Sequence, residues 1–293
     1  MVLSGCKKTK EGVEVVTAVT SGRSNGAKVL TPVAAGSVVY GNEAVRIDAS
    51  NARDGYLVVK YLGDSDNVKL QLTGPDNVTY TYNLNKEENT LPLSGDSGLY
   101  TAHLYVGVSG NEYATAYADS FELELVNKLG PYLYPNIYVD FNSATQAVRL
   151  AENLSEDASC DLDVVYSVYE YVTENISYDR EEAATIGNST YFPDVDEILA
   201  TKKGICFDYA ALMAAMLRSQ SIPTRLEIGY AGDAYHAWIS TYIRDVGWID
   251  GFIEFDGKSW TLMDPTFAAS AGSKDSLKKF IGDGSSYFVK YKY

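Results

Sequence analysis

The chain has 293 residues, of which 46% are hydrophobic and 22% charged, a composition typical of a folded protein of about two domains. Its formal net charge of −15 argues against nucleic-acid binding, because that function needs a basic surface to displace counterions from phosphate. No stretch of the sequence approaches the roughly 18 apolar residues that a membrane-spanning helix needs. Three cysteines are too few for a disulfide framework.

Residues 1–35 are rich in Thr, Ser, Gly and Val without helical periodicity, and they predict a tether with at most one strand. The tetrapeptide Leu-Ser-Gly-Cys that ends at Cys6 resembles a bacterial lipobox, in which the cysteine is lipidated after signal-peptide cleavage. Only Met1 and Val2 precede it, so the basic and apolar parts of a signal peptide are missing. A chance cysteine is the alternative. The resemblance implies a lipid anchor at Cys6, as the only membrane contact, on the extracellular face of the membrane, or else secretion.

Residues 36–127 have the pattern of short β-strands. Apolar and polar residues alternate in runs such as 56–61 and 68–72, and turn signals such as GPDN at 74–77 separate these runs. Short strands at this spacing predict an all-β sandwich of immunoglobulin-like type. Because no cysteine pair supports that type, the prediction rests on the rhythm of strands and turns alone.

Two features of this segment resemble ligand sites, and we assign neither of them. Asp64, Asp66 and Asn67 have a spacing like that of a calcium-binding loop, but the distal Glu of that pattern is absent. His103 lies in a predicted strand, where a histidine is more often a packed or surface residue than a ligand. The sequence therefore predicts no metal site.

From residue 128 the pattern changes to a mixture of helices and strands. Pro131 and Pro135 mark the boundary, and a helix is predicted over about 161–175. Cys160, at the start of that helix, is interpreted as a structural thiol. Residues 128–293 are thus predicted to form an α+β domain.

The most informative cysteine begins the run CFDYAALMAAMLR at residues 206–218. Ala, Leu and Met are strong helix formers, and Pro223 forbids continuation of the helix. Cys206 is therefore predicted at the N-terminus of a buried helix, where unpaired backbone N–H groups favour a thiolate and can bind an oxyanion. A cysteine on an Ala-rich helix is by itself more often a core residue, so the remaining motifs decide.

Two later motifs supply partners for a thiolate nucleophile. The run YHAWISTYI at 235–243 predicts a strand with His236 near its start, and SWTLMDPT at 259–266 predicts a strand that ends at Asp264. His236 is the only histidine in this half of the chain, and a base that generates a thiolate near neutral pH needs an imidazole. Asp264 would orient that ring and stabilise the imidazolium.

The order of these motifs resembles the transglutaminase-like superfamily of papain-like thiol enzymes. The resemblance covers roughly the C-terminal half of the chain and implies a papain-like/transglutaminase-like fold, with Cys206, His236 and Asp264 as its catalytic triad. The matching residues are GICFDYA at 204–210, LR at 217–218, IPTR at 222–225, HAW at 236–238, GW at 247–248, Trp260 and DPT at 264–266.

The family also uses an aromatic residue ahead of the cysteine loop to bind the oxyanion, a Trp in the animal cross-linking enzymes. Tyr178 stands at the matching place, and a phenol can donate the same hydrogen bond; a packed aromatic residue after a helix is the alternative. Trp238 is a candidate wall of the substrate cleft or a core residue, as are Trp248 and Trp260. Asp208 is expected to cap the helix start rather than to act in catalysis.

The predicted activity is thiol-dependent acyl transfer on peptide or amide bonds, with a peptide or protein substrate and no cofactor. With water as the acceptor the protein is a cysteine protease or amidase, which the resemblance to bacterial members of the family favours. With an amine as the acceptor it is a cross-linking transglutaminase. A catalytically silent surface binding module is the third hypothesis, and the complete set of triad residues disfavours it.

Overall fold

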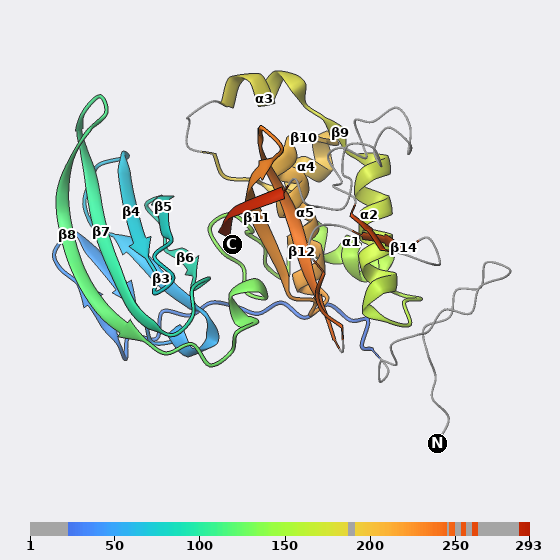
Figure 1. Ribbon diagram of the computed structural model, residues 1–293, viewed down its shortest axis with the longest axis horizontal. Coiled ribbons are helices and arrows are strands. Elements are labelled where there is room, and N and C mark those ends of the chain that lie inside the picture. Colours follow the sequence, from blue (N-terminus) through green and yellow to red (C-terminus); the bar gives the residue numbers. More distant parts are fainter. Residues whose placement is uncertain (1–22, 187–190, 245, 250–252, 256–259, 263–286) are drawn as a thin grey trace, which may run out of the picture. The chain divides into compact units, whose positions relative to one another are not determined.

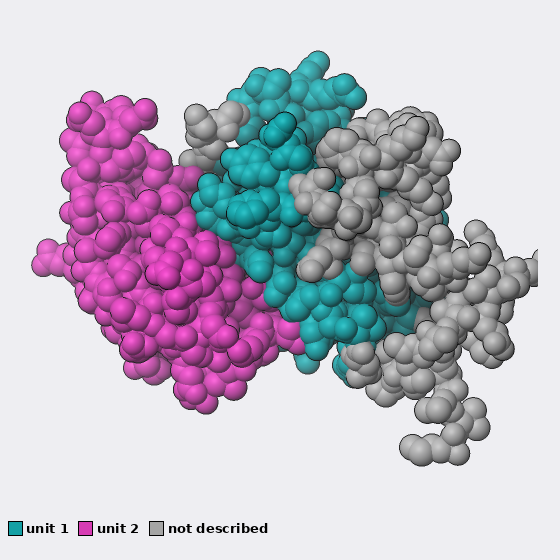
Figure 2. All heavy atoms as spheres, viewed as in Figure 1, with its two compact units in different colours: residues 1–30, 138–292 teal, residues 31–137, 293 magenta. Residues whose placement is uncertain are grey.

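The computed structural model describes residues 23–186, 191–244, 246–249, 253–255, 260–262 and 287–293 (Figure 1). The chain divides into two units. Unit 2 consists of residues 31–137 with Tyr293, and unit 1 consists of the described parts of residues 1–30 and 138–292 (Figure 2). The sequence predicts domains at 36–127 and 128–293. These limits refer to parts that fold independently, and they stay predictions. Within the described residues, no helix is long and apolar enough to cross a membrane.

Unit 2 is built from two four-stranded antiparallel sheets with short connections, coloured blue to green in Figure 1. The first sheet has the order β1-β2-β3-β6, with β1 at Val39–Gly41, β2 at Val45–Asp48, β3 at Tyr56–Tyr61 and β6 at Asn89–Pro92. The second has the order β5-β4-β7-β8, with β4 at Val68–Thr73, β5 at Thr79–Asn83, β7 at Gly98–Ser109 and β8 at Glu112–Leu123. Two 3₁₀ turns, η1 at Ala52–Asp54 and η2 at Gly130–Tyr132, complete the unit.

Alternation of side chains along the strands builds the core of unit 2. In β4, Leu70 is fully buried and pairs with the equally buried Leu104 of β7, whereas the residues on either side of Leu70 are partly exposed. Tyr40 of the first sheet stacks on Phe121 of the second, with ring centroids 4.2 Å apart. The period of two in the sequence therefore produces buried faces on paired strands. The immunoglobulin-like type stays a prediction.

Unit 1 combines helices with an antiparallel sheet of order β13-β12-β11-β16, drawn in orange and red in Figure 1. Its strands are β11 at Thr224–Ala231, β12 at Ala234–Ile243, β13 at Gly247–Ile249 and β16 at Tyr287–Lys292. The helices are α1 at Gln146–Leu154, α2 at Asp161–Asn175, α3 at Arg180–Ile186, α4 at Val195–Thr201 and α5 at Cys206–Ser219. Two short strand pairs are added, β9 at Ser177–Tyr178 with β10 at Lys203–Gly204, and β14 at Ile253–Phe255 with β15 at Trp260–Leu262.

Helix α5 is the centre of unit 1. Every residue from Asp208 to Ser219 is buried, and the helix packs against α1, α2, α4, β11 and β12. Buried Arg218 donates from Nε to the carbonyl oxygen of Thr224 at 3.0 Å, which attaches the end of α5 to the start of β11. A helix that is apolar on nearly all sides requires this surrounding shell, because an exposed face would leave apolar surface in water.

Residues 23–30 are part of unit 1, although they lie in the stretch predicted as a tether. The Arg23 side chain is 5% exposed and forms an ion pair with Asp161, at 2.5 Å between Nη1 and Oδ1. It also donates to the carbonyl oxygen of Gln220 at 3.0 Å, and the Lys28 N–H donates to the carbonyl oxygen of Ser219 at 2.7 Å. This part of the predicted tether is thus attached to the end of α5 and the start of α2.

Candidate active site

Cys206 is the first residue of α5, as the sequence predicts. Ile205 precedes it in an extended conformation, with φ −94° and ψ 178°, so the helix begins abruptly at the cysteine. The Cys206 side chain is partly exposed and is a free thiol. Cys160, at the start of α2, is buried and disulfide-bonded, so its interpretation as a structural thiol was wrong. Cys6 lies outside the described residues.

Asp208 fixes the start of α5. Its Oδ2 accepts a hydrogen bond from the Ile205 N–H at 2.8 Å, and its Oδ1 accepts one from the Tyr191 hydroxyl at 2.8 Å. A Cβ at position 204 would lie 2.7 Å from the Asp208 Cβ, which is why Gly204 is needed there. The geometry is that of the capping role expected for Asp208.

Burial raises the pKa of Asp208 to about 6, and the charges of Glu182 and Glu197 add to this effect. The hydrogen bonds from Ile205 and Tyr191 oppose the rise because they stabilise the charged carboxylate. Burial and the hydrogen bond to Asp208 also raise the pKa of Tyr191. Tyr191 is therefore a neutral phenol, and the Asp208 carboxyl group titrates near pH 6.

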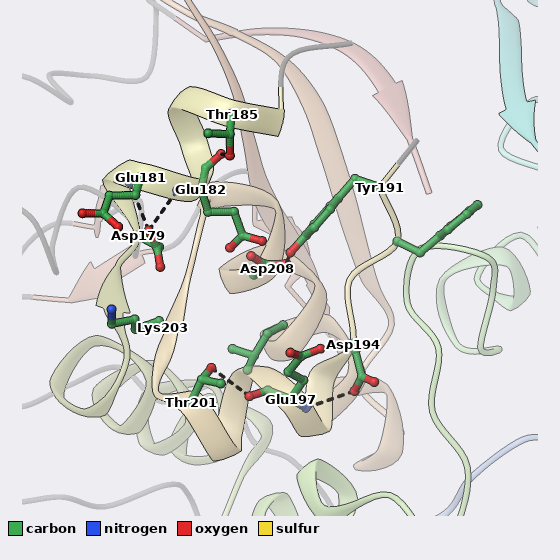
Figure 3. A pocket seen from close by; sticks show the side chains of 12 residues that line it. Asp179, Glu181, Glu182, Thr185, Tyr191, Asp194, Glu197, Thr201, Lys203 and Asp208 are labelled. Carbon is green, nitrogen blue, oxygen red and sulfur yellow. Dashed lines mark hydrogen bonds between the residues drawn. The ribbon is translucent and has the colours of Figure 1, made fainter. Parts of the chain in front are cut away.

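A pocket of about 530 Å³ lies next to this carboxylate (Figure 3). In Figure 3 the Tyr191 hydroxyl points toward Asp208, and further carboxylates come from α3, α4 and the segment before α3. Lys203 lies on the pocket wall. Within the described residues, no group of three or more His, Cys, Asp or Glu is arranged to hold a metal ion. The acidic residues of the wall are Asp179, Glu181, Glu182, Asp194, Glu197 and Asp208.

Tyr178 lies beside the cysteine loop. Strand β9 runs parallel to β10, and their register pairs Tyr178 with Gly204, two residues before Cys206. The Asp179 N–H donates to the carbonyl oxygen of Gly204 at 2.9 Å and closes this pairing. The structure thus brings the backbone of Tyr178 next to the predicted nucleophile, while its role as an oxyanion donor stays a prediction.

His236 lies on β12, the strand that packs directly against α5. It pairs with Gly229 of β11 and is 7% exposed. The ring of His236 stacks on that of Trp238, with centroids 6.3 Å apart and an interplanar angle of 26°. Trp238 is 2% exposed. The HAW motif therefore places a buried imidazole against a buried indole.

The start of β12 lies close to Cys206. Burial raises the pKa of the adjacent Tyr235, and the Tyr291 and Cys206 side chains raise it further. Successive side chains of a strand point to opposite faces, so this proximity concerns the strand and not the imidazole of His236. A distance within about 4 Å between the Cys206 sulfur and a ring nitrogen of His236 stays a prediction.

Asp264, the third member of the predicted triad, lies outside the described residues. The backbone of β15 ends two residues before it, at Leu262, in agreement with the strand predicted ahead of Asp264.

The side chain of Trp248 packs under the Arg225 guanidinium, whose central carbon lies 3.5 Å from the ring centroid. Trp248 thus packs with a cation at the sheet edge.

Sequence reasoning missed three residues of this region, namely Glu227, Tyr191 and Lys203. Glu227 is 1% exposed and accepts hydrogen bonds from the Trp238 indole and the Ser240 hydroxyl. A single Glu inside an apolar strand was the available signal, because a charged residue is rarely buried unless it is paired. Tyr191 and Lys203 gave no local signal, since the pocket is assembled from separate elements.

Comparison with known proteins agrees with the motifs. Residues 148–265 match the model of the Transglutaminase-like superfamily. YebA, an uncharacterized protein of Bacillus subtilis (strain 168), is 28% identical over 140 residues, which are 40% of this chain and 19% of the relative.

Two solved structures are similar at lower identity. The periplasmic domain of TgpA from Pseudomonas aeruginosa is 14% identical, with a TM-score of 0.37 over 79% of this chain and 96% of that one. Red sea bream transglutaminase is 15% identical, with a TM-score of 0.31 over 74% and 48% of the two chains.

The segment from residue 148 to residue 265 therefore belongs to the transglutaminase-like superfamily, as the order of the cysteine, HAW and DPT motifs predicts. This superfamily consists typically of enzymes, among them cysteine proteases and transglutaminases. The segment contains α2 to α5 and β9 to β15, and so includes both Cys206 and His236.

Proposed function

We propose that this chain is a thiol-dependent acyl-transfer enzyme that hydrolyses peptide or amide bonds, a cysteine protease or amidase. Cys206 is the nucleophile, His236 the base and Asp264 the residue that orients the imidazole. Tyr178 donates to the oxyanion. Trp238 is 2% exposed, so of its two predicted roles we keep that of a core residue and not that of a wall of the substrate cleft.

One observation carries the proposal: a free, partly exposed thiol stands at the first residue of a buried 14-residue helix. The N–H groups of the first turn of a helix are not used by the helix itself, and they attract negative charge. The Asp208 carboxylate takes the N–H of Ile205, just before the helix. A buried structural cysteine needs neither exposure nor this position, so the arrangement favours a nucleophile.

In the proposed reaction, the Cys206 thiolate attacks the carbonyl carbon and forms a C–S bond, and the carbonyl π electrons move to the oxygen. The Tyr178 hydroxyl and N–H groups at the start of α5 stabilise this oxyanion. Collapse of the intermediate breaks the C–N bond while the His236 imidazolium gives its proton to the leaving amine. Water then attacks the thioester carbon with His236 as base, the C–S bond breaks, and the carboxylic acid leaves while the Cys206 thiol is regenerated.

A panel of peptides and small amides, incubated with the full chain and analysed by mass spectrometry, tests the proposal. Hydrolysis adds the mass of water across one bond, whereas cross-linking joins an added primary amine with loss of ammonia. Cys206→Ala is the control, since it removes the nucleophile but keeps the helix. Products that persist in Cys206→Ala, or no product from any substrate, would contradict the proposal, and the second result would favour a silent binding module.

We also propose that the enzyme acts outside the cytoplasm, as a secreted protein. The disulfide at Cys160 supports this location, because structural disulfides persist in oxidising compartments and are rare in the cytosol. It also disfavours the lipid anchor, because the chain has three cysteines and Cys206 is a free thiol. Peptide mapping of the native protein without reduction should find Cys160 in a disulfide. Diacylglycerol on Cys6 together with a free Cys160 thiol would contradict this proposal and favour the anchor.

A further inference from the structure

A buried polar cluster lies on the face of the sheet that carries His236. The Glu227 carboxylate on β11 is 1% exposed, and its Oε2 accepts from Trp238 Nε1 at 2.9 Å and from the Ser240 hydroxyl at 2.6 Å. Trp238 and Ser240 are both buried, and both lie on β12. The carboxylate of one strand thus binds two alternate side chains of the next strand, the strand of His236.

Burial of a carboxylate is costly unless charged or polar groups stabilise it. On the same strand, an Arg225 nitrogen lies 4.0 Å from Glu227 Oε1, the limit of an ion pair, and its guanidinium stacks on Trp248. Across the sheet, Lys292 of β16 is paired with Glu227 in register. The Trp238 and Ser240 donors on β12 lie closer to the carboxylate than the Arg225 nitrogen does. A hydrogen bond to a charged group is stronger than one between neutral groups, so these two donors stabilise the buried carboxylate.

The Trp238 indole connects this carboxylate to the imidazole. Glu227 holds its N–H, and Tyr287 of β16 packs edge-on against its ring at 5.0 Å and 83°. The His236 ring stacks on the same indole at 6.3 Å. Gly229, which faces His236 across the strands, has no side chain to orient that ring. An indole fixed on two sides therefore forms the surface against which the imidazole rests.

We propose that Glu227 is a positioning residue: it fixes the Trp238 indole, and the indole in turn fixes the His236 imidazole in the orientation that serves Cys206. This inference rests on the proposed function. Without the acceptor, the buried indole N–H is left unsatisfied and the indole is free to rotate, which removes the surface under the imidazole. Glu227 accepts from the Trp238 indole, on which the His236 ring stacks, so we infer that its effect on the reaction passes through Trp238.

The test measures the rate at which iodoacetamide alkylates Cys206 in the full chain, from pH 5 to pH 9, by peptide-resolved mass spectrometry. Glu227→Leu removes the acceptor, and Trp238→Phe removes the donor while keeping an aromatic face. Both should lower the rate at pH 6 by about tenfold and leave it nearly unchanged at pH 9, where an ordinary exposed thiol is mostly ionised. Glu227→Gln keeps an acceptor for the indole and should restore most of the rate.

Thr241→Val is the matched control, because Thr241 is a buried residue of the same strand whose side chain points to the opposite face from that of Ser240. It should leave the pH profile unchanged. If Glu227→Leu and Trp238→Phe lower the melting temperature but keep the profile of the wild type, Glu227 is only structural and the inference is wrong. Trp238→Phe and Glu227→Gln decide the matter if Glu227→Leu does not fold.

His236→Ala separates this inference from the proposed function. If His236→Ala slows alkylation at pH 6 while the Glu227 and Trp238 variants do not, only the positioning role fails. If His236→Ala leaves the rate unchanged, the catalytic assignment itself fails, and the positioning role fails with it.

Discussion

Two buried aspartates, one in each unit, have opposite electrostatic surroundings. Burial would raise the pKa of Asp48 in unit 2, but hydrogen bonds from Ser50 and Gly36 and the charge of Arg46 outweigh it and lower the pKa. Burial raises the pKa of Asp208 in unit 1 to about 6, and two neighbouring glutamates add to the rise. Asp48 is thus stabilised as a carboxylate, whereas Asp208 is held near its point of titration.

The difference extends to the other buried polar residues. In unit 2, Asn89 donates to the carbonyl oxygens of Val59, Asn85 and Glu87, so its side chain replaces missing backbone partners in a loop. In unit 1, the buried ionisable residues include Asp208, Glu227 and His236, and they lie at the start of α5 and on the two strands beside it. Ionisable groups are costly to bury, so their presence on α5 and on the strands packed against it supports the proposed site in unit 1.

The chain has two histidines, one in each unit, and substituting each of them gives the sharpest test of the difference between the units. His236→Ala should slow alkylation of Cys206 at pH 6 by about 10²-fold, because an ordinary thiol titrates near 8.5 and is scarcely ionised there. His103→Ala should leave the rate unchanged, since His103 lies on β7 of unit 2. Peptide-resolved alkylation of both variants measures the effect, and equal rates for the two would remove the distinction between the units.

A core substitution in unit 2 tests the converse. Leu104 is fully buried, so Leu104→Ala should destabilise unit 2 by about 2–5 kcal/mol through lost burial and the cavity that remains. The rate of Cys206 alkylation under native conditions should not change. Urea unfolding together with the alkylation assay checks both statements, and a slower alkylation rate in the folded variant would show that the site depends on unit 2.

The two aspartates predict opposite dependences of stability on pH. Because folding raises the pKa of Asp208, its folded state binds more protons than the unfolded state between about pH 4 and pH 6, and stability falls as pH rises through this window. Asp208→Asn should remove this fall, which is about 3 kcal/mol at 1.36 kcal/mol per pKa unit.

Asp48→Asn should have the opposite effect on the pH dependence of stability. Folding lowers the pKa of Asp48, so this residue stabilises the folded protein above the ordinary value of 3.8, and the stabilisation is lost as pH falls below that value. Urea unfolding at pH steps from 3 to 7 measures both slopes. If both substitutions change the slope of stability against pH in the same direction relative to the wild type, the electrostatic contrast between the units is wrong.

Two arginine ion pairs give the smallest expected difference. Arg23 in unit 1 is nearly buried where it pairs with Asp161, so Arg23→Ala should destabilise unit 1 by about 1–3 kcal/mol. Arg53 in unit 2 pairs with Glu124 on the surface, with both side chains more than half exposed, and Arg53→Ala should cost about 0–1 kcal/mol. Thermal unfolding of both variants compares them. An equal loss would mean that the burial of Arg23 adds nothing to the contribution of its ion pair.

The sequence by itself determined the elements whose signals are local. The Ala, Leu and Met run after Gly204 defines α5, because helix propensity and Pro223 act within that segment. The strands of unit 2 follow from a period of two that each strand carries alone. The order of the cysteine, HAW and DPT motifs identified the superfamily, since chemistry restricts the residues at those positions.

Only the tertiary structure decided which residues meet. The parallel pairing that sets Tyr178 beside Gly204 joins segments about 25 residues apart, and the burial of Glu227 depends on donors from the next strand. Helices α3 and α4, which are short and partly polar, form with Asp208 a pocket that no periodicity indicates. These features are contacts between distant parts of the chain, and local propensity contains no information about the partner that a side chain will find.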